Sequence, residues 1–300
     1  MVDSSTSSSG TNPYEGYVMD AENAAEMARL MIQDHLLTQA MGGLIPEQPN
    51  LSQVSHVLDI GSGPGGWLLN LVTQYPHIQG YGIDISQLMT EYATSLAASQ
   101  NLTNVQFQVM DATKPLNFPN NSFDLVNGRI LMGFLTTSQW PSLLQECYRI
   151  TKPGGMIRLT EGEWGFTNSV ALDRLTGLAT LSFHRACHSF SPHGRTFGTI
   201  PVLSSLLRQA GYQNIQHRAH VVDFSTGTAI HEANVQNVLI VYKLLQPLFT
   251  QLQLVSQEEL DVLYEQMEEE LQAKDFSAID FFLTAWGRKG QQKSPTIFVA

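Results

Sequence analysis

The sequence is short of basic residues and cysteines, and each shortage argues against a class of protein. Lys and Arg number 16 against 27 Asp and Glu, so the formal net charge is −11. Nucleic-acid-binding proteins usually present a basic face to the phosphates, and we therefore expect no nucleic-acid partner. The two cysteines, Cys147 and Cys187, show no paired spacing that would indicate a disulfide framework or a thiolate metal site. This usage fits the reducing cytoplasm, where we expect the protein to act.

Long apolar runs are also missing. None approaches the roughly 18 to 20 residues that a membrane-spanning helix needs, so we expect no membrane span. Residues 1–11 are polar and rich in serine, without the basic region or apolar core of a signal peptide. We expect residues 1–16 to be a disordered tail. The hydrophobic content of 43% is enough for the rest of the chain to bury a core.

Helical and strand patterns alternate along most of the chain. Asp20 opens a helical pattern that runs to about Met41, where two glycines end it. Strands are predicted at 54–60, 78–83, 105–110, 123–126, 156–160, 217–224 and 279–286, and further helices at 66–75, 87–99, 138–150, 169–188, 200–210, 230–249 and 258–273. This order is typical of an α/β fold. We predict a doubly wound, Rossmann-like sheet of seven strands, mostly parallel, with an antiparallel last strand.

The most informative segment runs from Val57 to Trp67 and reads Val-Leu-Asp-Ile-Gly-Ser-Gly-Pro-Gly-Gly-Trp. It is a buried-strand pattern followed directly by a glycine-rich turn. Gly61, Gly63 and Gly65 lack a Cβ atom, so the backbone can take positive φ and a ligand can approach the main chain closely. In doubly wound domains such a turn, between the first strand and the first helix, holds a cofactor at the carboxyl end of the sheet.

The second predicted strand ends in an acid. Asp84 follows Asp59 by 25 positions, close to the separation at which a carboxylate meets ribose hydroxyls in such folds. At this point NAD and other adenosine cofactors fit equally well. Gly61, Gly63 and Gly66 satisfy the dinucleotide fingerprint Gly-x-Gly-x-x-Gly, but a fourth glycine in the turn makes the match unspecific.

Three later features decide between these cofactors. Asp111 stands in Met-Asp-Ala after the third strand, Asn127 and Gly128 follow the Phe-Asp-Leu-Val strand, and Lys-Pro-Gly-Gly occupies 152–155. Together with the glycine turn and the acid after the second strand, this ordered set, from about residue 53 to 160, resembles class I S-adenosylmethionine-dependent methyltransferases. Within that family, Asn-Gly-Arg-Ile-Leu resembles the small-molecule group that includes ubiquinone/menaquinone C-methyltransferase-like enzymes.

The resemblance implies a role for each matching position in binding the methyl donor. Gly61, Gly63 and Gly65 line its methionine and ribose, and Asp84 binds the ribose. Ile85 flanks the adenine, and Asp111 and Ala112 read its edge. Asn127 lies beside the methionine amino group, and Gly128 and Arg129 belong to the same binding site.

Two of these polar positions leave alternatives open. Asp59 either holds the amino group through water or braces the loop, and we favour bracing. Arg129 either contacts the donor carboxylate or an anionic acceptor, or makes a salt bridge at the start of a helix. Gly133 and Phe134 depart from the family pattern, because relatives often place a His after the Arg-x-Leu segment. We therefore assign no residue here the function that this His has in the relatives.

Candidates for the acceptor side follow the fifth strand and occupy the amino-terminal segment. Glu161 and Glu163 are candidates for taking a proton or binding an amine, with exposed charge as the alternative. His184 is a third catalytic candidate. Contacts with the acceptor are predicted for Tyr14, Tyr17, Met31, Trp164 and His188, while core packing remains an alternative for Met31. His184 and His188 are four positions apart without the Glu of a zinc-protease motif, so we predict no metal.

These observations predict an S-adenosylmethionine-dependent methyltransferase. It transfers a methyl group to O, N or C of a small organic acceptor by in-line displacement, and S-adenosylhomocysteine is the product. We expect a helical lid at 17–52, a methyltransferase domain at 53–300 with cap insertions at about 162–197 and 228–273, and a monomer or homodimer. An NAD-dependent oxidoreductase and a non-catalytic S-adenosylmethionine-binding module remain as alternatives. An oxidoreductase would need a proton donor such as a Tyr-x-x-x-Lys pair, and the sequence has no such pair beside the sheet edge.

Overall fold

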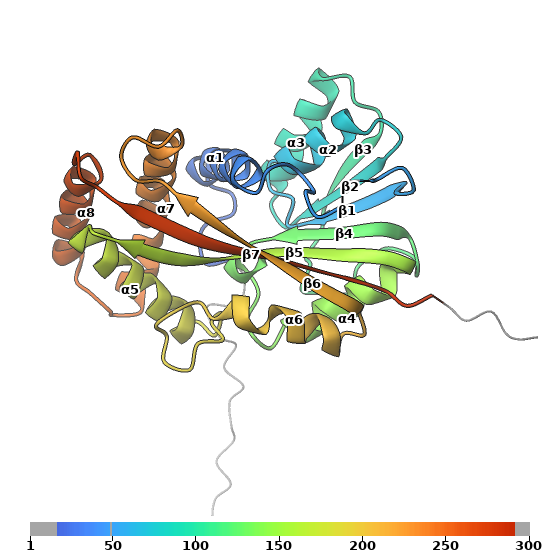
Figure 1. Cartoon of the computed structure of the whole chain (residues 1–300). Coiled ribbons are helices and arrows are strands. Elements are labelled where there is room, and N and C mark those ends of the chain that lie inside the picture. Colours follow the sequence, from blue (N-terminus) through green and yellow to red (C-terminus); the bar gives the residue numbers. More distant parts are fainter. Residues whose placement is uncertain (1–16, 49, 292–300) are drawn as a thin grey trace, which may run out of the picture.

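A seven-stranded sheet organises the protein, and the predicted fold class is confirmed. The computed structural model describes residues 17–48 and 50–291. The strand order is β3-β2-β1-β4-β5-β7-β6 (Figure 1). Strands β1 to β5 pair in parallel, and β7 is antiparallel to both β5 and β6. The strands are β1 (His56–Ile60), β2 (Gln79–Asp84), β3 (Val105–Val109), β4 (Phe123–Arg129), β5 (Thr151–Thr167), β6 (Gln213–Asp223) and β7 (Ala278–Arg288).

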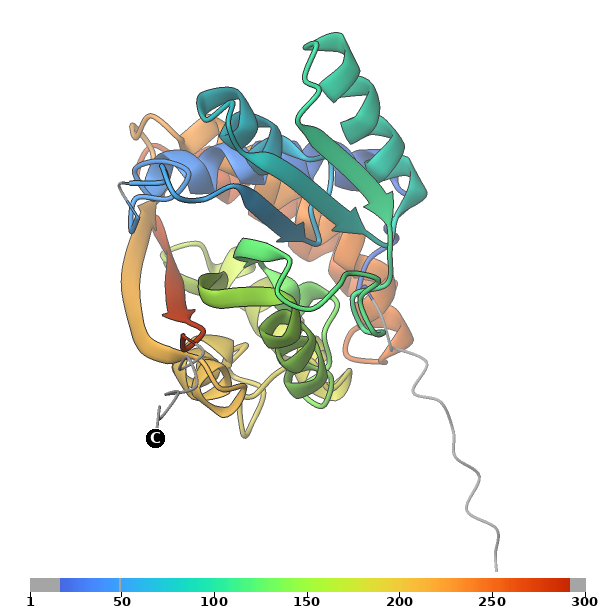
Figure 2. The same cartoon turned by 90° about the vertical axis from the view of Figure 1, so that its right-hand side faces the viewer.

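Helices cover both faces of this sheet. In Figure 1, α1 lies above the central strands, α4 and α6 lie below them, and α7 and α8 stand at the left of the view. The sheet between them twists strongly, as the view in Figure 2 shows. The helices are α1 (Ala24–Ala40), α2 (Gly66–Gln74), α3 (Gln87–Ser99), α4 (Trp140–Ile150), α5 (Val170–Arg185), α6 (Thr199–Gln209), α7 (His231–Gln251) and α8 (Gln257–Leu271).

The core lies under the central strands because their side chains are covered from both faces. Val57, Leu58 and Ile60 of β1 and Leu125 and Val126 of β4 are completely buried. Such strands read as near-continuous apolar runs, which is why β1 was visible in the sequence. In the part of the chain that the structure describes, no helix is long and apolar enough to cross a membrane.

Helix α1, which belongs to the segment predicted as a lid and called the lid below, begins at Ala24, later than the sequence pattern indicates. Asn23, not Asp20, is the N-cap, and its side chain accepts from the backbone N–H of Ala25 at 2.8 Å. Asp20 instead closes a short turn by accepting from the N–H of Glu22. The carboxylate of Glu22 in turn accepts from the first N–H groups of α3, so an exposed contact joins the amino end of the lid to α3.

The fifth strand is much longer than its predicted range of 156–160. It begins at Thr151, because residues 152–155 form a bulge between two β4 pairings rather than a turn outside the sheet. It continues to Thr167, because the antiparallel neighbour β7 pairs with its second half. Glu161, Glu163 and Trp164 therefore belong to a strand and not to a loop that follows it.

One prediction concerns the glycine turn, where the backbone of Gly65 has φ +82°. A Cβ atom at Gly65 would lie 2.7 Å from the ring of Phe107 and 2.9 Å from Cβ of Ala93. We expect Gly65→Ala to destabilise the protein by about 2 kcal/mol or more, through strain and overpacking. The exposed Gly177 in α5 has nothing within 4 Å of its Cβ position, so Gly177→Ala should stabilise by about 0.5–1 kcal/mol. Urea denaturation measures both, and equal effects would contradict this account.

Candidate functional site

A cavity of about 380 Å³ opens where the strand order changes direction. Strand β1 has β2 on one side and β4 on the other, and in open α/β sheets ligands bind at this switch point, beyond the carboxyl ends of the strands. The cavity has two parts. One, here called the donor half, surrounds the glycine turn and the ends of β2 and β3. The other, the acceptor half, lies among α1, α7, the second half of β5 and the first half of β7.

The ribose position predicted at Asp84 lies against the glycine turn. One oxygen of this carboxylate accepts from the backbone N–H of Gly63 at 2.8 Å, and the other accepts from Ser86 at 3.0 Å. Burial raises the pKa of Asp84. Gly61 and Gly63 line the cavity with Asp84, whereas Gly65 is absent from the described lining because it packs against β3 and α3. The family resemblance gave no sign of that difference.

The residues expected around adenine also meet at this end. Ile85, Asp111 and Ala112 line the donor half together with Met110. The Ile85 side chain is 54% exposed, so it presents an apolar surface that the protein itself leaves uncovered. One oxygen of Asp111 accepts from the backbone N–H and the hydroxyl of Thr113, at 2.8 and 2.7 Å, and its other oxygen has no partner in the described structure.

Behind the turn, Asn127 joins a buried polar chain and lies outside the described lining. Its amide nitrogen donates to Asp59 at 2.7 Å, and its oxygen accepts from Arg158 at 2.9 Å. Arg158 also pairs with the fully buried Glu47. Burial raises the pKa of Asp59 to about 6, and this carboxyl reaches the cavity. Both groups of the Asn127 amide are thus engaged inside the protein. Gly128 is likewise not among the described lining residues, since it packs against Leu131.

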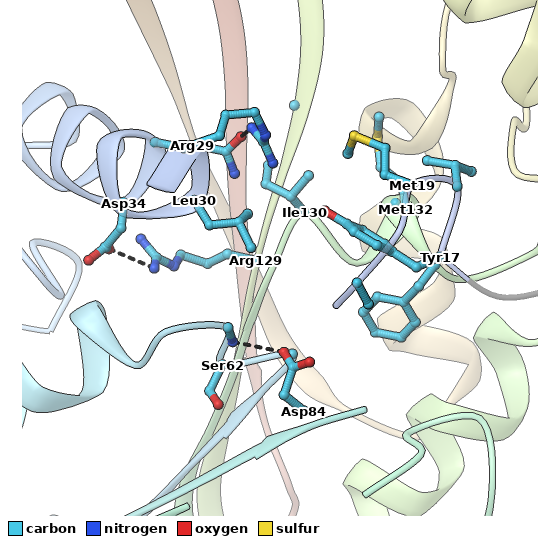
Figure 3. Close-up of a pocket in the computed structure, with 18 of the residues that line it drawn as sticks. Tyr17, Met19, Arg29, Leu30, Asp34, Ser62, Asp84, Arg129, Ile130 and Met132 are labelled. Carbon is cyan, nitrogen blue, oxygen red and sulfur yellow. Dashed lines mark hydrogen bonds and ion pairs between the residues drawn. The ribbon is translucent and has the colours of Figure 1, made fainter. Parts of the chain in front are cut away.

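Arg129 connects the end of β4 to the lid. Its Nη2 atom lies 2.7 Å from Asp34 Oδ1 on α1, and Figure 3 shows both side chains at the edge of the cavity. The guanidinium also lies over Trp67, 6.0 Å from the ring centroid. Nη1 is buried and has no hydrogen-bond partner in the described structure. Asp34 was missed in the sequence, because one charge on a helix gives no sign of what the helix covers.

A buried polar cluster forms the lid side of the acceptor half. Arg29 donates to both oxygens of Glu26 at 2.7 Å, and its Nη1 donates to Gln33 and, across to α7, to Asn237. The Tyr17 hydroxyl donates to Glu26 as well. Burial raises the pKa of Tyr17, so this hydroxyl stays protonated. Tyr17 lines the cavity as predicted for an acceptor contact, whereas Tyr14 lies outside the described residues.

The remaining wall of the acceptor half is apolar. Trp164 contributes an aromatic ring that packs on Phe197 and Tyr242, with centroids 4.8 and 5.3 Å away. Met31, a predicted acceptor contact, is 42% exposed and is not among the described lining residues. Other apolar side chains of this wall are Ile130, Met132, Phe134, Phe183, Val222, Val241, Leu245 and Phe282.

The two acids predicted after the fifth strand have different positions. Glu161 is fully buried away from the described lining, and it accepts from the backbone N–H groups of Leu131 at 2.8 Å and Met132 at 3.3 Å. Glu163 reaches the cavity, but its two oxygens accept from the N–H groups of Phe197 and Gly198. Both acids hold backbone turns, which strand periodicity alone does not reveal.

The predicted histidines are not brought to the cavity. His184 packs against Gly194, and the buried His188 lies 3.1 Å from the carbonyl oxygen of Met132 through Nδ1. Neither belongs to the described lining. Among residues 17–48 and 50–291, no group of three or more His, Cys, Asp or Glu has a geometry that would hold a metal ion.

Comparison with known protein families identifies the segment that forms the donor half. A family model described as a methyltransferase domain matches residues 57–155. The chain carries a class I S-adenosylmethionine-dependent methyltransferase domain. The matched segment of this domain runs from β1 to the bulge of β5, so it includes the donor half of the cavity and little of the acceptor half.

Relatives of the methyltransferase domain include fungal and bacterial proteins. The probable methyltransferase ltbC of Aspergillus luteorubrus is 27% identical over 190 residues, which are 61% of this chain and 64% of that protein. A demethylmenaquinone methyltransferase of Geobacillus kaustophilus is 32% identical over 108 residues, 36% of this chain and 45% of that protein. The matched region thus covers less than two thirds of either relative.

A solved structure shares the fold of the methyltransferase domain. Phosphoethanolamine N-methyltransferase 2 of Haemonchus contortus, in complex with S-adenosyl-L-methionine, superposes with a TM-score of 0.50 and 21% identity. The match covers 84% of this chain and 52% of that one. At this level of identity the likeness concerns the arrangement of strands and helices.

A second prediction concerns Glu161, whose pKa burial raises to about 8. The folded protein therefore holds a proton that the unfolded chain loses above about pH 4.5. The stability that this carboxyl contributes is present below pH 4.5 and is lost as pH rises toward 8. Gln mimics the protonated side chain and does not titrate. Relative to Glu161→Gln, we expect the wild type to lose on the order of 1 kcal/mol per pH unit between pH 5 and 8 in urea denaturation. A difference independent of pH would contradict this.

Proposed function

We propose that the protein is an S-adenosylmethionine-dependent methyltransferase that methylates O, N or C of a small organic acceptor. The observation that carries this proposal is Asp84 at the end of β2, placed against the glycine turn in a cavity that also contains Asp111 and Arg129. The family match, which covers the same segment, supports it. So does the fold shared with an enzyme solved in complex with S-adenosyl-L-methionine.

Three groups of residues would hold the donor. Asp84 accepts hydrogen bonds from the ribose hydroxyls, while Gly61 and Gly63 let the sugar and the methionine lie against the backbone. Ile85 covers one face of the adenine. Asp111 and Ala112 read its edge, and the free oxygen of Asp111 suits an amino group. Asp59 faces the amino group of the methionine.

Arg129 binds the methionine carboxylate in this proposal. Its buried Nη1 has no partner in the described structure, while Nη2 is held by Asp34. A carboxylate satisfies such a donor, and a charge-assisted hydrogen bond is stronger than a neutral one. The two sequence-based readings of Arg129, a donor contact and a salt bridge, are therefore compatible.

Methyl transfer itself needs little acid–base chemistry. When bound, S-adenosylmethionine supplies a methyl group on a positively charged sulfur, and attack by an acceptor lone pair or carbanion in line with the S–CH₃ bond leaves a neutral thioether. The protein's residues orient the acceptor and exclude water, which supplies much of the rate. Tyr17, Ile130 and Trp164 form parts of the wall that would do so.

The acceptor in this proposal is small and largely apolar, because the acceptor half is walled mainly by aromatic and aliphatic side chains. Arg29, the arginine of α1 that lines this half, already pairs with Glu26. A cytoplasmic location and a monomeric or homodimeric state stay predictions from the sequence.

The first test is calorimetric titration with S-adenosylhomocysteine, for which we expect binding well below millimolar concentration. Asp84→Asn should weaken this binding at least tenfold, because the amide cannot accept from both ribose hydroxyls while facing the Gly63 N–H. It should weaken 5′-methylthioadenosine equally, since that ligand carries the same ribose. Absence of S-adenosylhomocysteine binding by the folded wild type would refute the proposed function.

Arg129→Lys should separate the two ligands. It should weaken S-adenosylhomocysteine about tenfold, because lysine does not reproduce the forked guanidinium contact with a carboxylate. Binding of 5′-methylthioadenosine, which has no carboxylate, should change less than twofold in the same titration. Equal losses for both ligands would mean that Arg129 acts on the fold of the lid rather than on the methionine carboxylate.

A further inference from the structure

Asp280 brings a carboxylate from β7 into the acceptor half of the cavity, and nothing in the sequence had marked it. In the sheet it pairs with Val222 of β6, which also lines the cavity. One oxygen of Asp280 accepts from the backbone N–H of Gly165 at 3.1 Å. Its other oxygen has no partner within the described residues, and no Lys, Arg or His there lies within ion-pair distance.

The other charged groups of the acceptor half are already satisfied. Both oxygens of Glu163 accept backbone N–H groups, and Arg29 is neutralised by Glu26. Among the described carboxylates that line this half, Asp280 is therefore the one with a whole oxygen that no protein donor contacts. A half-buried carboxylate in that condition is partly desolvated, and a ligand that supplies a donor offsets this cost.

The surroundings of Asp280 narrow the chemistry of that donor. Trp164 precedes the glycine that holds the carboxylate, and its ring packs on Tyr242. Burial raises the pKa of Asp280 to about 7, so the group is mostly ionised at pH 8. An uncharged hydroxyl or a protonated amine on a flat apolar body suits such a pocket. A carboxylate would bring a second negative charge close to the first.

We propose that Asp280 binds an O–H or N–H donor group of the methyl acceptor and makes the acceptor half reject acceptors that carry a carboxylate at that end. The inference rests on the proposed function, because the acceptor half binds an acceptor only if the donor half binds the methyl donor. In this proposal β7, which lies outside the matched segment 57–155, contributes to the selection of the acceptor.

Three probes that share one ring test this proposal: 2-naphthol, 2-naphthylmethylamine and 2-naphthoate. Each is titrated calorimetrically at pH 8 into the full chain saturated with S-adenosylhomocysteine. We expect at least one of the naphthol and the amine to bind ten times more tightly than the naphthoate. The stronger of the two identifies which donor the site prefers.

Asp280→Asn should reduce this preference to less than threefold, because an amide also offers a donor to the naphthoate. Asp275→Asn makes the same chemical change at an exposed position just before β7, and it should keep the wild-type ratio. The ratio in the wild type tests the proposal even if the Asp280 variant does not fold.

Three results would overturn the proposal: naphthoate binding as tightly as the other probes, an unchanged ratio in Asp280→Asn, or no binding of any probe at millimolar concentration. A failure of the proposed function is recognised separately. In that case S-adenosylhomocysteine itself does not bind in the first titration, before any probe is added.

Discussion

The glycine turn after β1 is confined on two sides, and the arrangement of the cavity depends on that confinement. A Cβ atom at Gly65 would collide with Phe107 of β3, and one at Gly66 would lie 2.2 Å from Asp34 Oδ2 of the lid. The same short segment thus fixes how closely the lid and the outer strands approach β1. Because close packing transmits small displacements, a change in this turn reaches every wall of the donor half.

The donor half was largely predictable, since its residues are close in sequence to recognisable strand ends. Ser86 caps α3 at the start of the predicted helix 87–99, and its side chain accepts from the N–H of Met89. Asp84 and Arg129 are the last residues of β2 and β4, and Asp111 lies just after β3. What the sequence predicted wrongly is which of these side chains reach the cavity and which are buried behind it. A residue such as Asn127 occupies the expected place on β4, yet its side chain turns to Asp59 and Arg158, which only the folded sheet brings near.

The acceptor half was poorly predictable because its residues are brought together only by contacts between distant parts of the chain. It is assembled from segments separated by more than a hundred positions, from Tyr17 in the lid to Asp280 on β7. The second half of β5 is a strand because β7 pairs with it, and a strand defined by a distant partner leaves little local signal. Glu161 and Glu163 were therefore predicted as acceptor-side or exposed acids, whereas the folded chain directs both to backbone N–H groups.

The attachments of the lid differ at its two ends. Near the carboxyl end, Glu47 pairs with Arg158, and both side chains are completely buried. At the amino end, Glu22 contacts the first N–H groups of α3 in full contact with solvent. Water competes with exposed hydrogen bonds and not with buried ones, so the Glu22 contact with α3 separates at lower free energy than the buried Glu47 contact. The amino end is held to the rest of the protein mainly through the Val18 N–H, which donates to the Gly133 carbonyl, and through the buried Tyr17 hydroxyl, rather than through α3.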